Sequence, residues 1–399
     1  MTARPDFVLK DAVRPNIYAL LPYRCARDDY KEGILLDANE NSFGPALASR
    51  NDFQAPAASG ALGNSDVHLE RYPDPHQHDI KKLLCGLRGI PSTDYFFLGV
   101  GSDESIDIAM RVFCKPSIDK ILICPPTYGM YSVSAQVNDV QVVRVPLDTT
   151  DGLFQLQVDK ILDELKNDHT IKMVILCSPG NPTGTLLKHQ DIKRILDCTS
   201  FKGVVLVDEA YIDFCGDAGG ANVNSVASWT VQYPNLIVTQ TLSKAFGLAG
   251  IRLGISISSP AISQIFNNTK APYNISTPTS LLGRAALSES GQDTMRHHIT
   301  SIIEERRDLL QKFAKMPRLG MPLGNNDSNF ILIPILNSSG TPDNEIALRI
   351  YKRLAEYEGV VVRFRGNELG CTGCVRITIG TPSQNITLVE KLGMLLSQF

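Results

Sequence analysis

Short apolar runs alternate with amphipathic segments along the middle of the chain. Runs rich in Val and Ile lie at residues 95–100, 120–124, 140–145, 172–177, 203–207, 235–239 and 254–257. Apolar runs of this length, spaced by helix-length segments, are typical of buried and mostly parallel strands. Amphipathic segments at 105–113 and 188–198 fit helices between those strands. The pattern therefore predicts an α/β layered domain.

The pattern changes after about residue 274. Helices are expected at 283–288, 293–314, 345–358 and 385–398, and strands at 330–334, 359–363 and 374–379, which predicts a smaller α+β domain. We expect residues 1–45 to form an N-terminal arm packing on that domain or on a partner subunit, residues 46–275 the large domain, and residues 276–399 the small domain. Residues 46–66 are rich in Ala, Ser, Gly and Asn without a period, which predicts a surface insertion.

Composition and charge exclude several classes of protein. The 399 residues carry a formal net charge of −3 without a conspicuous cluster of Lys and Arg, which argues against nucleic acid or a membrane surface as a partner. No apolar run approaches the roughly 18 residues that a membrane span needs, and the first thirty residues show no apolar core of a signal peptide. We therefore expect a soluble, cytoplasmic protein.

The nine cysteines are an odd number scattered through a long chain. This distribution fits reduced thiols better than a disulfide framework. Cys371-Thr-Gly-Cys374 has the spacing of a redox or metal site, but neither a second pair nor a nearby histidine accompanies it. We expect no metal site.

Lys244 is the first candidate for chemistry. It follows the predicted strand at 235–239 and lies among the apolar residues Leu242, Ala245 and Phe246. Ligands of open α/β sheets bind outside the carboxyl ends of the strands. Desolvation there lowers the pKa of a lysine and makes its amine nucleophilic toward a carbonyl. The alternative is a surface lysine at a strand–helix junction.

Arg252 lies eight residues beyond Lys244, after Gly-Leu-Ala-Gly. A guanidinium close to an ammonium group is unfavourable unless an anion lies between them, and a phosphate is the natural anion. Thr241 and Ser243 supply hydroxyls to the same anion. The alternative is an arginine in a structural salt bridge.

Asp208 ends the apolar run at 203–207 and is followed by Glu-Ala-Tyr211. A half-buried carboxylate at a strand end needs a cationic or donor partner. The protonated ring nitrogen of pyridoxal phosphate is one, and the pair would keep the ring an electron sink. Magnesium is another, although the chain lacks the phosphate-binding loop G-x-x-x-x-G-K-[ST].

Three further turns follow predicted strands. Cys177-Ser-Pro-Gly-Asn181-Pro-Thr-Gly184 would hold Asn181 rigidly as a donor, or else is an ordinary turn. Gly99-Val-Gly101-Ser102-Asp103-Glu104 opens a predicted helix, whose free N–H groups can bind phosphate, or else Ser102 is a simple N-cap. Tyr128, in Pro125-Pro-Thr-Tyr-Gly-Met-Tyr131, could stack on a flat ring or pack in the core.

Three motifs in this order resemble those of the aspartate aminotransferase superfamily of fold type I: Ser178-Pro-Gly-Asn-Pro-Thr-Gly184, Asp208-Glu-Ala-Tyr211 and Ser243-Lys-Ala-Phe-Gly-Leu-Ala-Gly-Ile-Arg252. Within it, the chain resembles the histidinol-phosphate aminotransferases through Leu36-Asp-Ala-Asn-Glu-Asn41, Arg71-Tyr-Pro-Asp-Pro75, Pro125-Pro-Thr-Tyr-Gly-Met-Tyr131, Ala271-Pro-Tyr273 and Gly373-Cys-Val-Arg-Ile-Thr378. It departs from them at 46–66. The resemblance implies a large domain with a mostly parallel seven-stranded sheet between helices, a smaller α+β domain and an N-terminal arm.

The resemblance also implies pyridoxal 5′-phosphate as the cofactor. Lys244 would carry it as a Schiff base and move a proton during catalysis, and Asp208 would pair with its ring nitrogen. Asn181 and Tyr211 would bind its phenolic oxygen, and Tyr128 would stack on its ring. Ser102, Asp103 and Glu104 would lie on the turn beside the phosphate, and Thr241, Ser243 and Arg252 would bind it. Tyr72 would reach this phosphate from the second subunit of a homodimer.

Substrate contacts are expected from Tyr23, Asn39, Tyr72, Asn181, Arg363 and Arg376. Arg363 and Arg376 could serve in turn the phosphate ester of histidinol phosphate and the carboxylates of glutamate or 2-oxoglutarate. Arg365 is the second choice for a substrate contact, because it lies two residues from Arg363 and shares a face with it only if the strand is regular there. The implied reaction is a ping-pong transfer between glutamate and imidazole acetol phosphate in histidine biosynthesis.

Three alternatives stay open at this point. They are an aromatic amino-acid aminotransferase, a decarboxylase of a phosphorylated amino acid that uses the same cofactor, and a non-catalytic homologue. The complete set of Lys244, Asp208, Asn181, Tyr211 and Arg252 speaks against the last.

Overall fold

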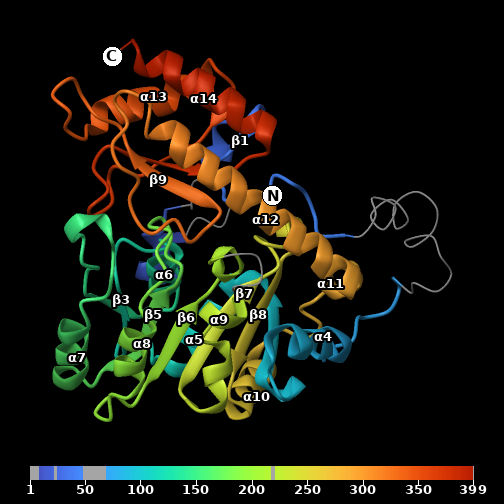
Figure 1. The fold of residues 1–399 in the computed structure, drawn as a ribbon. Helices are drawn as coiled ribbons and strands as arrows, with labels where there is room; N and C mark the ends of the chain where they lie inside the picture. Colours follow the sequence, from blue (N-terminus) through green and yellow to red (C-terminus); the bar gives the residue numbers. More distant parts are fainter. Residues whose placement is uncertain (1–8, 22–24, 48–68, 217–220, 399) are drawn as a thin grey trace, which may run out of the picture.

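The computed structural model describes residues 9–21, 25–47, 69–216 and 221–398 (Figure 1). Tyr23 and nearly all of the predicted insertion at 46–66 lie outside these residues. None of the described helices is long and apolar enough to cross a lipid bilayer.

A seven-stranded sheet forms the centre of the large domain. Its spatial order is β2 (Phe96–Val100), β8 (Leu253–Ser258), β7 (Leu236–Thr241), β6 (Val204–Asp208), β5 (Ile171–Cys177), β3 (Lys120–Ile123) and β4 (Gln141–Arg144). Only β8 runs antiparallel to its neighbours within this sheet. Each of the seven apolar runs forms one of these strands, so the predicted mostly parallel seven-stranded sheet is confirmed.

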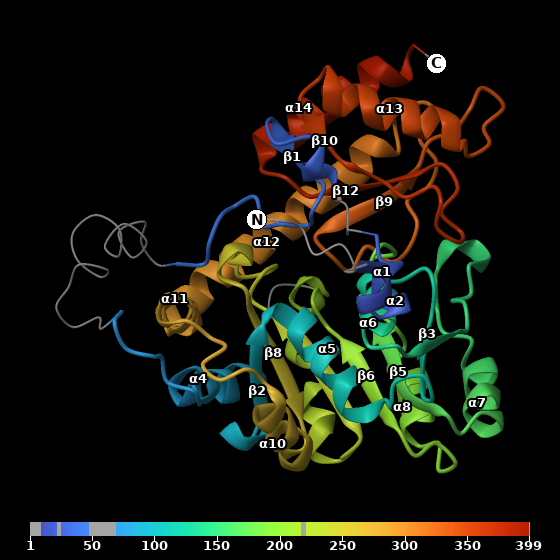
Figure 2. The ribbon, with the colours of Figure 1, turned by 180° about the vertical axis from the view of Figure 1, so that it is seen from behind.

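Helices cover both faces of this sheet, because successive side chains of a strand point to opposite faces. Phe97 packs with α5 (Gly101–Phe113), α6 (Met130–Val137) and α10 (Pro260–Thr269) on the face turned forward in Figure 2. Phe96 and Leu98 point the other way, toward a core with α4 (His78–Arg88), α7 (Val158–Asn167) and α8 (His189–Leu196). The short helix α9 (Ala221–Asn224) follows β6. The strands are therefore buried on both sides, which explains their continuous apolar runs.

The C-terminal part forms a second, smaller layer. Its antiparallel sheet has the order β11 (Arg363–Phe364), β12 (Cys374–Thr378) and β9 (Phe330–Pro334). The accompanying helices are α12 (Glu289–Phe313), α13 (Asn344–Glu356) and α14 (Pro382–Leu396). Figure 1 shows α12 spanning from the large domain to this layer.

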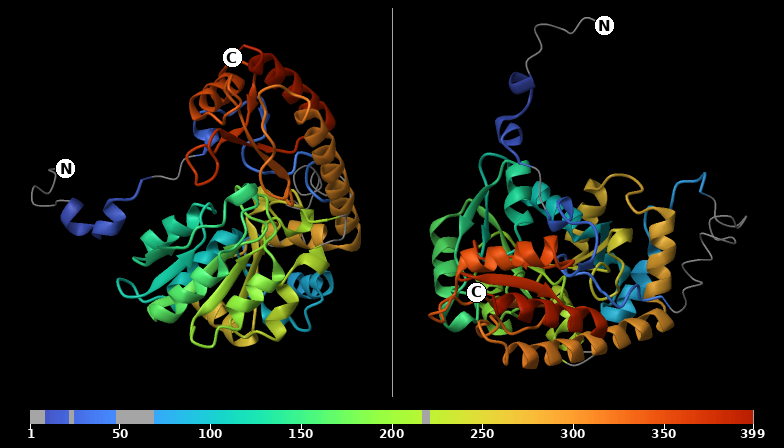
Figure 3. Two further views of the ribbon diagram at one scale, coloured as in Figure 1. Left: turned by 60° about the vertical axis from the view of Figure 1, so that its left-hand side comes forward. Right: turned by 90° about the horizontal axis from the view of Figure 1, so that it is seen from above.

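Segments near the proposed domain boundaries make contacts across them. β1 (Ile34–Leu35) pairs in parallel with β10 (Val360–Val361), so this part of the N-terminal segment joins the small domain. α11 (Thr277–Leu287) packs on α4 of the large domain. The helices α1 (Leu9–Ala12) and α2 (Pro15–Tyr18) lie at the periphery (Figure 3), where Asn16 Nδ2 donates to the Gln136 carbonyl at 2.8 Å on α6. The N-terminal residues consequently touch both layers.

Candidate active site

A cavity of about 350 Å³ lies where the strands of the large domain end. Cys177, Asp208 and Thr241, the last residues of β5, β6 and β7, line it, and Arg363 and Arg376 line it from the small domain. It brings together most of the side chains that the sequence singled out: Asn39, Ser102, Asp103, Tyr128, Asn181, Asp208, Tyr211, Thr241, Ser243, Lys244, Arg252, Arg363 and Arg376. This is the ligand position expected for an open α/β sheet.

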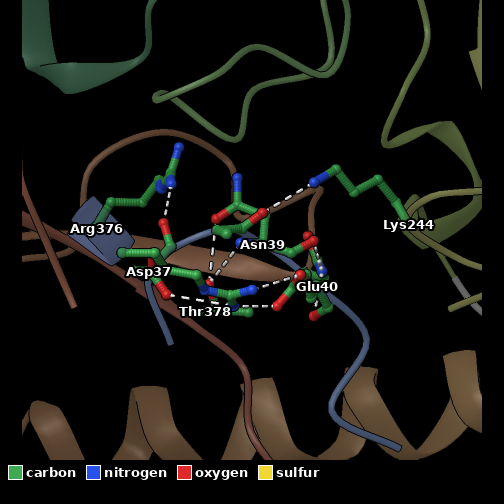
Figure 4. Close-up of polar contacts among 9 residues, drawn as sticks. Asp37, Asn39, Glu40, Lys244, Arg376 and Thr378 are labelled. Atoms are coloured by element: carbon green, nitrogen blue, oxygen red, sulfur yellow. Dashed lines mark hydrogen bonds and ion pairs between the residues drawn. The ribbon is translucent and has the colours of Figure 1, made fainter. Parts of the chain in front are cut away.

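Lys244 enters the cavity from the turn after β7, where the flanking Leu242 and Ala245 are both buried. Its Nζ donates to the Ala38 carbonyl at 2.9 Å, so the side chain reaches toward the N-terminal segment (Figure 4). Burial, aided by the positive charge of Arg376, lowers the pKa of Lys244 to about 8. A larger fraction of neutral, nucleophilic amine is therefore present near neutral pH than for an exposed lysine.

Asp208 is only 3% exposed. Its Oδ2 accepts a hydrogen bond from Tyr131 Oη at 2.6 Å and its Oδ1 from Thr239 Oγ1 at 3.1 Å. Burial raises the pKa of Asp208 to about 6, and the hydrogen bonds from Tyr131 and Thr239 oppose that shift. A buried carboxylate held by neutral donors suits a cationic group of a ligand in the cavity.

Arg376 joins the two domains across the cavity. It is 4% exposed, and its Nη1 donates to Asn181 Oδ1 at 2.6 Å. Its Nη2 donates to the Asp37 carbonyl (Figure 4). Arg376 Nε is buried without a hydrogen-bond partner among the described residues. The guanidinium thus retains a donor, and an anion near it would find a desolvated positive charge.

Asn39 and Tyr211 meet at the same wall. Asn39 Nδ2 donates to Tyr211 Oη at 3.0 Å, and the Asn39 amide donates to Thr378 Oγ1 at 3.0 Å. The backbone of Asn39 has a φ of +54°, a conformation that asparagine tolerates better than most residues. Burial raises the pKa of Tyr211 to about 12, so its hydroxyl stays protonated and can donate to a ligand oxygen.

A further group of lining residues is suited to an anion. The first turn of α5 places Ser102 and Asp103 there, and Arg252 Nη2 lies 3.4 Å from Asp103 Oδ2. Gly101 has a φ of +70°, and a Cβ at this position would lie 2.5 Å from Arg252 Nη2. Thr241 Oγ1 lies 2.8 Å from Ser243 Oγ on the same wall. Helix N–H groups, hydroxyls and guanidinium groups are the donors that bind phosphate in proteins.

Three of the expected side chains are not brought into this cavity by the described structure. Glu104 does not line it, and its carboxylate accepts hydrogen bonds from Asn274 Nδ2 at 3.0 Å and from the Val100 amide. Tyr72 is 81% exposed and stacks on Tyr273 with ring centroids 4.6 Å apart. Tyr23 lies outside the described residues.

Other lining residues had no role assigned from the sequence. Glu40 lines the cavity and accepts a hydrogen bond at 3.0 Å from Nη1 of Arg27, which is not itself a lining residue. The motif Leu36-Asp-Ala-Asn-Glu-Asn41 contained the signal for Glu40, whereas nothing in the sequence marked Arg27. Arg365, ranked second, also lines the cavity, and Glu368 Oε1 holds its Nη1 at 2.8 Å.

Comparison with known families agrees with this geometry. The family model described as aminotransferase class I and II matches residues 31–392. The chain belongs to this family. Enzymes of the family depend on pyridoxal 5′-phosphate.

Similar proteins cover nearly the whole chain. The histidinol-phosphate aminotransferases of Candida maltosa and Saccharomyces cerevisiae are both 45% identical, covering 98% and 96% of this chain and 99% and 96% of their own. That of Cytophaga hutchinsonii is 41% identical over 97% of this chain and 99% of its own. The solved structure of the Sinorhizobium meliloti histidinol-phosphate aminotransferase, in complex with pyridoxal-5′-phosphate, has a TM-score of 0.80 at 22% identity and covers 97% of this chain and 98% of its own.

The residues of the cavity fit pyridoxal 5′-phosphate on chemical grounds. A partly desolvated lysine suits its aldehyde, and a buried carboxylate that forms no salt bridge with a described residue suits its ring nitrogen. Arg252, Ser243 and the start of α5 suit its phosphate. Each functional group of the cofactor therefore has a chemically matched side chain in one cavity.

Proposed function

We propose that this chain transfers an amino group from glutamate to imidazole acetol phosphate, giving histidinol phosphate and 2-oxoglutarate in histidine biosynthesis. The observation that carries the proposal is the 45% identity, over essentially full length, to histidinol-phosphate aminotransferases from several fungi. The cavity supports it, because Lys244, Asp208, Asn181, Tyr211 and Arg252 all line it.

The side chains divide the work between holding the cofactor and moving a proton. When bound, pyridoxal 5′-phosphate supplies an electron-withdrawing ring that stabilises negative charge on the substrate carbon. Lys244 would hold it covalently, Asp208 would face its ring nitrogen, and Asn181 and Tyr211 its phenolic oxygen. The amine of Lys244, with its pKa near 8, is matched to accept a proton from the substrate Cα and to return it.

The cations of the small domain would bind the substrate anions. Arg363 and Arg376 are register partners on adjacent antiparallel strands, and both line the cavity. Arg365 follows on the same side of the cavity. Glutamate presents carboxylates and histidinol phosphate a phosphate ester, so one cationic wall can serve both substrates in turn, as ping-pong kinetics requires.

We also propose that the enzyme is a cytoplasmic homodimer, with Tyr72 reaching the cofactor phosphate of the second subunit. The exposure of Tyr72 on the described chain supports this role. All nine cysteines are described and free, which suits a reducing compartment. Sedimentation of the purified protein tests the dimer, and loss of cofactor affinity in Tyr72→Phe tests the contact.

A substrate panel tests the proposed activity. The purified protein with cofactor is given histidinol phosphate, phenylalanine or tyrosine, each with 2-oxoglutarate, and glutamate formation is measured. We expect kcat/KM for histidinol phosphate to exceed the others by at least about a hundredfold, because only this substrate offers a phosphate. Faster reaction of an aromatic amino acid would indicate an aromatic aminotransferase. A phosphorylated amino acid is tested beside the panel, and release of carbon dioxide from it without formation of glutamate would indicate a decarboxylase.

A further inference from the structure

Tyr131 lies beneath the cavity rather than in it. Its side chain is fully buried, and its hydroxyl donates to Asp208 Oδ2 at 2.6 Å. The edge of its ring meets the ring of Tyr128, with centroids 5.5 Å apart and an interplanar angle of 87°. Tyr131 therefore contacts two side chains expected to hold the cofactor ring.

We propose that Tyr131 is a positioning residue that keeps the Asp208 carboxylate charged and aimed at the ring nitrogen of the cofactor. A buried hydroxyl at this distance favours the ionised form of the acceptor, because the hydrogen bond is stronger to a carboxylate than to a carboxylic acid. It also fixes which oxygen of Asp208 faces the protein and which direction stays available for a ligand. The inference rests on the cofactor alone and holds whichever amine the enzyme transfers.

The other groups around Asp208 differ in whether they favour its ionised form. Thr239 on β7 donates to the other oxygen at the longer distance of 3.1 Å, and the Ala210 amide contributes a backbone hydrogen bond. The negative charge of Asp103 on α5 raises the pKa of Asp208, whereas burial raises the pKa of the Cys177 thiol on β5 to about 12, so this thiol stays neutral. Of the two side-chain hydrogen bonds to Asp208, the one from Tyr131 is the shorter.

The tyrosine itself remains a donor at any working pH. Burial, together with the negative charge of Asp208, raises the pKa of Tyr131 well above its usual value. The hydroxyl proton therefore stays on Tyr131, and the negative charge of the pair stays on Asp208. Removing the hydroxyl should raise the pKa of Asp208, and a neutral Asp208 cannot balance a protonated ring nitrogen.

Ligand binding to the cofactor-free protein tests the proposal without any turnover. The probes are pyridoxamine 5′-phosphate, which does not need Lys244 for attachment, and its 1-deaza analogue, in which C–H replaces the ring nitrogen. We expect Tyr131→Phe to weaken binding of the first roughly ten- to a hundredfold, the size of a hydrogen bond to a charged group. Binding of the deaza analogue should change less than about threefold, because it presents no nitrogen to Asp208.

The pH dependence provides a second signature. The pH below which pyridoxamine phosphate affinity falls should move upward in Tyr131→Phe, because Asp208 would then neutralise at higher pH. Thr239→Val should move it less. Equal losses for both probes would show a merely structural role, and unchanged affinity for both would show no role; either result overturns the proposal.

Two further variants serve as controls for this test. Tyr30→Phe removes a tyrosine–carboxylate hydrogen bond to Glu356 outside the cavity, and should leave both affinities unchanged. If Tyr131→Phe alone does not fold, the same substitution is made in the Asp208→Asn variant, which lacks the buried charge, and the double variant is compared with Asp208→Asn. There the added Tyr131→Phe change should alter pyridoxamine phosphate affinity less than about twofold, and a further tenfold loss would refute action through Asp208.

Discussion

The burial of Asp208 leads to a prediction about stability. This carboxylate is 3% exposed, and its hydrogen bonds from described residues come from neutral donors, namely Tyr131, Thr239 and the Ala210 backbone amide. Its charge is therefore costly until a cation pairs with it. We expect Asp208→Asn to stabilise the cofactor-free protein and to weaken cofactor binding at the same time.

The magnitude follows from the pKa of Asp208. Burial raises it from 3.8 to about 6, and each pKa unit corresponds to about 1.4 kcal/mol. A raised carboxyl pKa means that the folded chain binds more protons than the unfolded chain, so stability falls as pH rises from 3.8 to 6. The cost is absent below pH 3.8 and reaches about 3 kcal/mol above pH 6. An asparagine of the same shape removes it.

Unfolding in urea at two pH values measures this difference. Trp229, the one tryptophan of the sequence, packs against the large-domain core and reports unfolding by fluorescence. We expect Asp208→Asn to raise the free energy of unfolding by about 1–3 kcal/mol at pH 7.5 and by about 1 kcal/mol or less at pH 4.5. A gain of equal size at both pH values, or a loss at pH 7.5, would refute the reasoning.

A second buried aspartate provides the matched control. Asp213 is 7% exposed, but Arg88 Nη1 and Nη2 bind it at 2.8 Å and 3.1 Å. Asp213→Asn breaks a buried ion pair and leaves the guanidinium without its partner charge. It should therefore destabilise the protein by about 3–5 kcal/mol at pH 7.5. Opposite signs for the two variants would show that the partner, and not burial alone, decides the outcome.

Three further predictions concern the cavity. Lys244→Ala should abolish the absorbance of lysine-linked cofactor and lower turnover at least about a thousandfold. In the unmodified protein, the rate of cofactor attachment should rise as pH passes about 8, because the amine of Lys244 then loses its proton. Stopped-flow absorbance measures this rate. Arg376→Ala should raise KM for glutamate and for histidinol phosphate by about tenfold or more each, and a rise for only one in steady-state assays would contradict a shared anion site. Gly101→Ala, with its Cβ against Arg252, should weaken cofactor binding about tenfold in titrations, whereas Gly86→Ala, in open space, should not.

The sequence predicted the large domain well because its strands are buried on both faces. Apolar runs then persist without alternation, and each run was visible without knowledge of the pairing. Helix starts were less predictable, since they depend on single capping side chains. The helix expected at 293–314 begins at Glu289, because Ser288 caps it by accepting from the Gly291 amide at 3.2 Å.

The residues of the candidate site could be predicted where a polar side chain lies at the end of a predicted strand or just beyond it. Asp208 ends β6, and Lys244 lies just beyond the end of β7, so parallel topology alone brings them to one edge. Glu104 follows Asp103 in the sequence but does not line the cavity, because successive residues of α5 point about 100° apart around the helix axis. Asp103 consequently faces the cavity and Glu104 faces Asn274. The hydrogen bond from Tyr131 to Asp208 could not be predicted, because it depends on how α6 packs on the sheet and no local sequence pattern reveals that packing.

The N-terminal segment explains how two strong cations remain ordered before a ligand binds. Lys244 donates to the carbonyl of Ala38 and Arg376 to that of Asp37, and both acceptors are neutral backbone groups just beyond β1. A carbonyl accepts a hydrogen bond without cancelling the positive charge of the donor, and neither Lys244 nor Arg376 forms a salt bridge with another described residue. An incoming anion then replaces a neutral acceptor by a charged one, which is the stronger hydrogen-bond partner. Because backbone carbonyls belong to every residue, substitutions at Ala38 should preserve this arrangement as long as β1 keeps its register with Val360 and Val361.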